Sequence, residues 1–226
     1  MANHLDLEEQ EQLDQLKHFW NNWGTLISVV VIVVCGAIAS WNGYRYWQNR
    51  QALQSAVLAE AVESAVQAND KARVEQAWSD LSDKYGSTAQ AGQTGLVVAK
   101  YWADSGNQDA AKNALQWVSS KASDDGLKAL AKLRLVSVLM EQKSYDEVLA
   151  ALGGSFPPEF QAVVADRKGD VLALKGQRQE AIVEYNRAFK AFDDRVEYRR
   201  LVEVKLNALG AEPQVVVSAG TTKDSK

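Results

Sequence analysis

The side chains that most often carry enzymatic chemistry are few in this 226-residue chain, and their positions do not favour catalysis. His4 and His18 are its two histidines, and both precede a long apolar run, so neither can serve a site in the larger part of the chain after that run. Asp166 and Asp170 lie four residues apart, a spacing that places two carboxylates on one helix face. Basic residues follow Asp166 directly, which is more typical of a solvated charged face than of a pair of catalytic carboxylates.

Other signatures of catalysis or of cofactor binding are absent from the sequence. It contains no Cys-x-x-Cys motif, no His-Glu-x-x-His motif and no glycine-rich phosphate loop. The single cysteine, Cys35, lies in the apolar run, so an internal disulfide is impossible. The net charge of -4 argues against a general nucleic-acid surface. We therefore expect a protein that is not an enzyme, with no metal, no other cofactor and no nucleic-acid partner.

The apolar run predicts a helix that crosses a membrane. No charged residue lies between Phe19 and Tyr44. A helix from Trp23 to Trp41 rises roughly 27 Å, close to the ~30 Å thickness of the hydrocarbon core of a bilayer. Tryptophan and tyrosine side chains flank both ends, as in the aromatic belts of spanning helices. We predict a transmembrane helix at residues 23–43, surrounded by membrane lipid.

A cleaved signal peptide is the alternative for this run. The small residues around Ile38 resemble a cleavage site, but a signal peptide begins with a basic segment. Residues 1–22 form an acidic tail instead, which is either a short amphipathic helix or a solvated, frayed segment. Orientation is barely decided by charge, because Lys17 precedes the run and Arg45 and Arg50 follow it. Counted literally, the positive-inside rule places the C-terminal part in the cytoplasm.

Small residues mark one face of the predicted transmembrane helix. Gly36, Ser40 and Gly43 are spaced by four and three residues. Such a face lets another helix approach closely, although small residues are common in membrane helices. We treat these three residues as a candidate packing face.

Helical segments alternate with short breaks after Gln51. The breaks contain Gly, Asn, Asp, Ser or Pro and lie at Asn69-Asp70, Gly86-Ser87, Ser105–Asn107, Ser123–Gly126, Lys143-Ser144, Gly153–Pro158 and Gly176-Gln177. The segments between them are long enough for several turns, with apolar residues at helical spacing. Short breaks between such helices favour antiparallel neighbours.

Three of these segments repeat one another: QDAAKNALQWV, YDEVLAALGGS and RQEAIVEYNRA. Their matched positions Ala111, Val148 and Ala181 are separated by 37 and 33 residues, and the turn positions Gly106, Lys143 and Gly176 keep the same register. A helix-turn-helix unit with a period of about 34 residues is the signature of tetratricopeptide repeats. A helical hairpin array without true repeats is the alternative. We predict an all-α chain with one transmembrane helix followed, over residues 44–210, by a tetratricopeptide-like superhelix of antiparallel helix pairs.

The predicted superhelix has a concave surface that suits an extended peptide. Its first helices would offer a mixed set of side chains to this groove: Lys100, Leu133, Ser137, Met140, Asp166 and Asp170. Gly169 is predicted to allow close approach of two paired helices. Residues 195–210 fit a final capping helix that packs Val196, Leu201, Val202, Leu206 and Leu209 and leaves Arg199, Arg200 and Lys205 in solvent. Residues 211–226 are predicted to be a disordered tail.

Together these features resemble the YfgM family of Gram-negative bacteria, the ancillary subunits of the SecYEG translocon. The stretches that carry the resemblance are Gly43–Trp47, Leu127–Leu152, Ala162–Ile182 and the KLNAL segment at Lys205. The resemblance covers most of the chain from Trp20 to Leu209. It implies an inner-membrane protein with a cytoplasmic N-terminus and a periplasmic C-terminal domain, against the literal charge count.

The resemblance also implies partners. These are the SecYEG translocon, the membrane-anchored periplasmic chaperone PpiD, and unfolded or newly translocated polypeptides. Two other functions remain open from the residues alone. One is a scaffold that assembles partners without binding a client polypeptide, and the other is a regulator whose cytoplasmic tail, from Leu5 to Lys17, binds a signalling protein.

Overall fold

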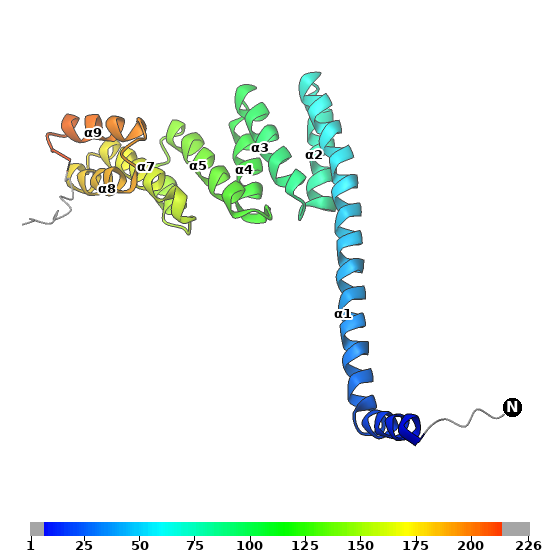
Figure 1. Ribbon diagram of the computed structural model, residues 1–226. Coiled ribbons are helices and arrows are strands. Elements are labelled where there is room, and N and C mark those ends of the chain that lie inside the picture. Colours follow the sequence, from blue (N-terminus) through cyan, green and yellow to red (C-terminus); the bar gives the residue numbers. More distant parts are fainter. Residues whose placement is uncertain (1–6, 214–226) are drawn as a thin grey trace, which may run out of the picture. The chain divides into compact units, whose positions relative to one another are not determined.

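The structure is a computed structural model that describes residues 7–213 of the chain. The chain divides into two compact units, Met1–Leu53 and Gln54–Lys226. All regular secondary structure in the described residues is helical, which confirms the predicted all-α fold class (Figure 1). The predicted disordered tail falls mostly on residues 214–226, outside the described residues.

Helix α1 (Leu7–Gln67) is continuous over 61 residues and contains the whole predicted transmembrane segment. It is long and apolar enough to cross a membrane by length and composition. Its side chains from Leu13 to Arg50 are almost all exposed, as expected of a segment that has no protein core of its own. No helix end coincides with the predicted boundaries at residues 22 and 43, because the sequence there contains no proline and its small residues do not interrupt the backbone hydrogen bonds.

The second unit is a succession of helix pairs, which follow one another along the chain in Figure 1. After the last turns of α1 its elements are α2 (Lys71–Tyr85), α3 (Ala89–Asp104), α4 (Gln108–Lys121), α5 (Asp125–Glu141), α6 (Tyr145–Leu152), the 3-10 helix η1 (Pro158–Phe160), α7 (Gln161–Leu174), α8 (Arg178–Ala191) and α9 (Tyr198–Ala208). Helices α1 to α7 end within two residues of the predicted breaks, whereas α8 ends at Ala191, where no break was predicted. Four of them begin at an Asp, Thr or Asn whose side chain accepts a hydrogen bond from a backbone N–H of the first turn, as helix N-caps do.

The turn inside each helix pair and the turn that follows α9 recur with nearly constant spacing. Each has one residue with a positive φ, namely Asn69, Gly106, Lys143, Gly176 and Gly210, separated by 37, 37, 33 and 34 residues. At each turn the N–H of this residue donates to the carbonyl three residues before it, and the N–H of the following residue donates to the carbonyl five residues before that one. At the second turn, for example, Gly106 N–H donates to Ala103 and Asn107 N–H donates to Trp102. This confirms the predicted repeat. It also adds a first repeat, formed by the end of α1 with α2, that the alignment of three segments did not include.

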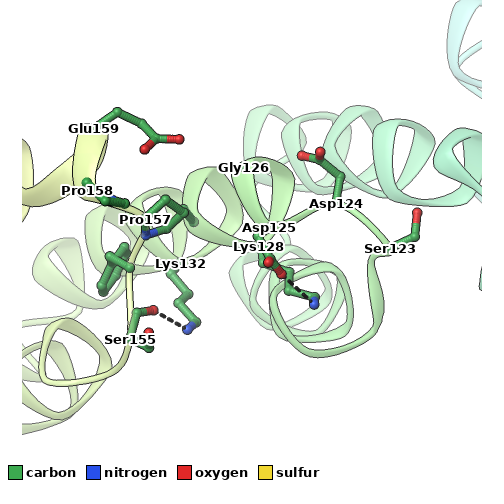
Figure 2. Close-up of a pocket in the computed structure, with 12 residues that line it drawn as sticks. Ser123, Asp124, Asp125, Gly126, Lys128, Lys132, Ser155, Pro157, Pro158 and Glu159 are labelled. Carbon is green, nitrogen blue, oxygen red and sulfur yellow. Dashed lines mark hydrogen bonds and ion pairs between the residues drawn. The ribbon is translucent and has the colours of Figure 1, made fainter.

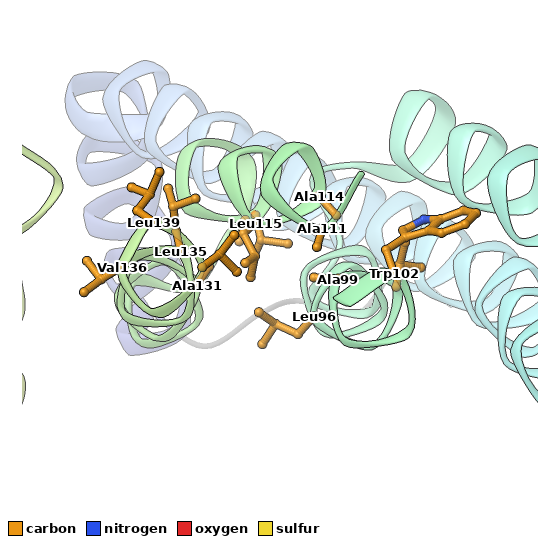
Figure 3. Close-up of a cluster of buried hydrophobic side chains, with 14 of the residues drawn as sticks. Leu96, Ala99, Trp102, Ala111, Ala114, Leu115, Ala131, Leu135, Val136 and Leu139 are labelled. Carbon is orange, nitrogen blue, oxygen red and sulfur yellow. The ribbon is translucent and has the colours of Figure 1, made fainter. Parts of the chain in front are cut away.

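The repeat positions form the core. The residue five after each of the first four turn residues is fully buried, and these residues are Val74, Ala111, Val148 and Ala181. In α7 the predicted close approach occurs at Gly169, where an added Cβ would lie 2.5 Å from Cδ1 of Tyr185 in α8. Figure 3 shows how α3, α4 and α5 bury Leu96, Leu115 and Leu135 together. Apolar residues of successive repeats therefore form a main core cluster that extends from Val62 to Val171. A second cluster lies among α7, α8 and α9, and a small third one joins Ala59, Leu81 and Ala91.

Helix α9 ends the array. Val202 and Leu206 are buried as predicted, but Val196 and Leu201 are 40% and 44% exposed, so the prediction that they pack is wrong. The physical reason differs for the two residues: Val196 lies before α9, which begins at Tyr198 and not at the predicted residue 195, and Leu201 lies on the exposed face of α9. Glu203 of α9 occupies the repeat position that the closely packed Gly169 occupies in α7. Each lies seven residues before the turn residue that follows its helix, Gly210 and Gly176 respectively. A charged residue at this position leaves no apolar surface there for a further helix to bury.

Candidate protein-interaction surfaces

A pocket of about 280 Å³ lies among α3, α4 and α5. Its lining residues are Ala99, Lys100, Ala103, Gln108, Leu115, Arg134, Ser137, Val138 and Glu141. It brings together two of the predicted groove residues, Lys100 and Ser137. They occupy the same position in successive repeats, six residues before their turn residues. The regular stacking of first helices therefore places them side by side.

The pocket combines an apolar wall with polar groups that a peptide could use. Lys100 Nζ lies 2.5 Å from Asp104 Oδ2 at the edge. Gln108 donates from Nε2 to Glu141 Oε2 at 3.4 Å, while its buried Oε1 has no hydrogen-bond partner among the described residues. A buried acceptor without a donor is costly, so this oxygen is a place where a peptide N–H would gain free energy.

Leu133 and Met140 lie differently. Both are half-buried and pack against the main core, so they contribute mainly to the packing of α5. Neither lines the pocket of Lys100 and Ser137. Sequence spacing placed them on the same helix as Ser137, but it could not distinguish a side chain turned into the core from one at the surface.

Asp166 has to be removed from the candidate groove surface, because it has no exposed surface at all. Its Oδ1 accepts from Lys205 Nζ at 2.7 Å and its Oδ2 from the hydroxyl of Tyr198 at 2.8 Å, both on α9. Asp170, which is mostly buried, accepts from the hydroxyl of Tyr185 at 2.8 Å and lies 2.6 Å from Lys205 Nζ. The interpretation of these carboxylates as a solvated face is therefore wrong, and so is the expectation that Lys205 stays in solvent.

The carboxylates of Asp166 and Asp170 both pair with the ammonium group of Lys205. Burial lowers the pKa of Lys205, but hydrogen bonds to Asp166 and Asp170 outweigh it, so the pKa of this lysine is raised above its ordinary value. Burial and the hydrogen bond to Asp166 raise the pKa of Tyr198 as well. A lysine that stays charged next to two carboxylates stabilises the docking of α9 onto α7. The network is a structural device of the last repeat.

The candidate face of the membrane helix is open along its length. Gly36, Ser40 and Gly43 are all exposed, and an added Cβ at either glycine would meet no other atom within 4 Å. The hydroxyl of Ser40 donates to the carbonyl of Gly36 at 2.8 Å, which satisfies it within the helix. Such a face can accept another helix by van der Waals contact.

A larger hollow, which sequence analysis did not identify, lies between the loops that precede α5 and α7. It has a volume of about 820 Å³ and is lined by residues 123–126, Lys128, Ala129, Lys132 and residues 155–159 (Figure 2). Lys132 Nζ donates to the carbonyl of Ser155 at 3.1 Å and lies 5.1 Å from the ring centroid of Phe156. Figure 2 shows acidic side chains, Glu159 among them, at its rim. The sequence predicts these loops only as breaks between helices, because it does not show that two separate loops lie together.

The pattern of repeats agrees with comparisons to known proteins. A model of the tetratricopeptide repeat-like domain family matches residues 17–211. An ancillary SecYEG translocon subunit of Neisseria gonorrhoeae is 35% identical over 213 residues, which is 92% of this chain and 100% of that protein. The chain belongs to the YfgM family of tetratricopeptide repeat-like proteins. The match includes both the predicted membrane helix and the whole helical array.

Other relatives of this YfgM-family chain carry the same name. The ancillary SecYEG translocon subunit of Escherichia coli is 28% identical over 207 residues, covering 89% of this chain and 96% of that protein. That of Haemophilus influenzae is 29% identical over 210 residues, covering 90% and 98%. The resemblance inferred from sequence motifs is thereby confirmed.

Among the described residues, no cluster of three or more His, Cys, Asp or Glu side chains could hold a metal ion.

Proposed function

We propose that this chain is a non-enzymatic, single-pass inner-membrane subunit that assists the SecYEG translocon. Its relatives over nearly their whole length are named as such subunits, and this observation carries the proposal. Helix α1 supplies a segment of the length and composition needed for the anchor. The N-terminus lies in the cytoplasm and the helical array in the periplasm, where it binds the chaperone PpiD and newly translocated polypeptides.

The pocket of Lys100 and Ser137 is the proposed contact for an extended polypeptide. Its apolar wall accepts a side chain, while Gln108 Oε1 accepts a hydrogen bond from the peptide backbone. Anchoring at the membrane raises the effective concentration of the pocket near the channel exit, so weak binding is sufficient. The open face at Gly36 and Gly43 is the proposed contact with a membrane helix of a partner.

Site-specific crosslinking tests the binding of a client. A photocrosslinking residue replaces Ser137 in the full-length protein, and a second variant carries it at Val183, which is exposed on α8. In membranes that hold an arrested translocation intermediate, we expect crosslinks to the nascent chain from position 137 and none from 183. If position 137 contacts PpiD or the channel equally with and without a substrate in transit, the protein is a scaffold only.

Orientation is tested separately in spheroplasts with an intact inner membrane. External protease should digest the helical array of the wild-type protein. Protection of the array until the membrane is broken would place it in the cytoplasm, as the count of Lys17 against Arg45 and Arg50 suggests. Deletion of residues 5–17 tests the regulator alternative, because the association with the translocon should survive that deletion if the proposal is correct.

A further inference from the structure

The first helix of every later repeat has a face turned toward the preceding repeat. In α9 this face includes Tyr198 and Lys205, which both bond to Asp166 of α7. Tyr198 and Lys205 lie twelve and five residues before the turn residue Gly210. Because the repeats share one register, the same offsets identify the corresponding face of each first helix.

This face is covered in the interior of the array. In α3 it is formed by Thr94, Val98 and Tyr101, which are all buried. In α5 it is formed by Ala131, Leu135 and Val138, which are buried as well. The helices that cover these faces are mainly the second helices of the preceding repeats, since α2 packs on α3 and α4 packs on α5.

No described part of the chain covers the same face of α1. Its residues at the corresponding offsets from Asn69 are Val57, Ala61 and Ser64. All three are exposed, and Val57 is 67% exposed. Small and apolar residues thus continue the pattern of a helix contact at the one repeat that has no predecessor within the described chain.

The open face is also hollowed. A groove of about 290 Å³ runs between the last turns of α1 and α2, and its lining residues are Leu58, Ala61, Ser64, Ala65, Arg73, Gln76, Ala77 and Asp80. A groove of this kind between two helices receives the side-chain ridge of a third helix.

The groove itself is lined by one basic and one acidic residue, Arg73 and Asp80, so the excess charge around it comes from the side chains beside it. Glu60 and Glu63 directly precede Ala61 and Ser64 in the sequence, and both are exposed; neither forms an ion pair among the described residues. Two charged residues within one turn are incompatible with cover by lipid hydrocarbon. A second copy of α1 would bring two further glutamates and no base from the same segment, since residues 54–67 contain no Lys or Arg.

We infer that an amphipathic helix of another protein packs on the open face of α1, formed by Val57, Ala61 and Ser64, and fills the adjoining groove between α1 and α2, in the way that a preceding second helix would. Its apolar residues recur every three or four positions, and Lys or Arg side chains along one flank pair with Glu60 and Glu63. This surface is separate from the pocket of Lys100 and Ser137, and the inference goes beyond the proposed function without resting on it.

Cysteine labelling of the full-length protein tests the inference. In a Cys35→Ala background, Ser64→Cys reports on the groove and Gln116→Cys, exposed on α4, serves as the matched control. A water-soluble maleimide is applied to native membranes opened by freeze–thaw, and to lipid vesicles that contain only the purified protein. If a partner covers about nine-tenths of the chains, labelling at position 64 is about tenfold slower in native membranes than in the vesicles, and labelling at 116 is unchanged.

A charge reversal tests the nature of the partner. Glu60→Lys with Glu63→Lys should restore rapid labelling at position 64 in native membranes, whereas Glu75→Lys, on the exposed side of α2, should leave it slow. Equal labelling of position 64 in native membranes and in vesicles would overturn the inference, because no partner would cover the groove. Slow labelling in the vesicles would assign the groove to a second copy, and slow labelling that survives the charge reversal would exclude a basic helix.

Discussion

The carboxylate of Asp166 and the ammonium group of Lys205 lie 2.7 Å apart, although 39 residues separate them in the sequence. Asp166 is fully buried on α7, and Lys205 reaches it from α9. A buried carboxylate without its partner is strongly unfavourable, so this pair makes the docking of the last helix dependent on one basic side chain.

Replacement of Lys205 by methionine should therefore release α9. Removing one member of a buried pair costs roughly 3 kcal/mol, and part of that cost here falls on Asp166. Hydrogen exchange of the full-length protein should show faster exchange of the amides of α9, with little change in α3. Arg200→Met, on the exposed side of the same helix, is the matched control and should leave exchange unchanged. Equal protection of α9 in Lys205→Met and in wild type would show that the pair adds nothing to docking.

The same pair predicts a loss of stability at alkaline pH. The pKa of Lys205 is raised above its ordinary value of 10.5, and burial raises the pKa of Tyr198 in the same direction. A group whose pKa is higher in the folded state stabilises that state below its unfolded pKa, and this contribution disappears as pH rises through the folded pKa. The difference in denaturation midpoint between wild type and Lys205→Met should stay constant between about pH 7 and 9 and shrink above about 10.5. A difference that shrinks toward acidic pH instead would contradict this assignment.

Gly169 should tolerate no larger residue. A Cβ at this position would lie 2.5 Å from the ring of Tyr185, so Gly169→Ala must separate α7 from α8 or displace the ring. Overpacking of this kind costs roughly 1–3 kcal/mol. Gly154→Ala is the control, because its Cβ would meet its nearest neighbours at 3.6 Å, an ordinary contact. Denaturant titration followed by circular dichroism should give a lower midpoint for Gly169→Ala than for Gly154→Ala.

Lys143 should be replaceable by glycine with a gain in stability. Its φ of 58° lies in the left-handed region, where a residue with a Cβ pays roughly 1 kcal/mol that glycine does not. We expect a higher denaturation midpoint for Lys143→Gly. The reciprocal change Gly176→Ala, at a φ of 76°, should lower it. If Lys143→Gly lowers the midpoint while Gly176→Ala raises it, conformational strain does not govern these turns.

Local patterns in the sequence were sufficient to predict most of the fold. Gly106 and Gly176 showed where helices turn, and the matched residues Ala111, Val148 and Ala181 showed the period. Both signals depend on nearby residues, so they survive without knowledge of the tertiary contacts. The first repeat was missed because Asn69, rather than glycine, takes the positive φ there and because α1 continues from the membrane segment without a break.

The candidate site was less predictable. The sequence predicts Lys100 and Ser137 on the groove because both lie on first helices of repeats, and the structure brings them into one pocket. Asp166 shares a helix with Asp170 and has basic neighbours, which suggested solvent exposure. Its true environment depends on Tyr198 and Lys205, far along the chain. Helical spacing contains no information about such a long-range partner.

The five equivalent turns make the array divisible into whole units. Gly106 and Lys143 have the same backbone conformation and the same hydrogen bonds, and Asn107 and Ser144 follow them in equivalent places. Excision of residues 107–143 would join Gly106 to Ser144 and leave every remaining helix with a partner of the usual type. The length of the helical array can therefore change by insertion or loss of one helix pair at a time. Its two ends, the open groove at α1 and the terminal helix α9, are unchanged by such an event.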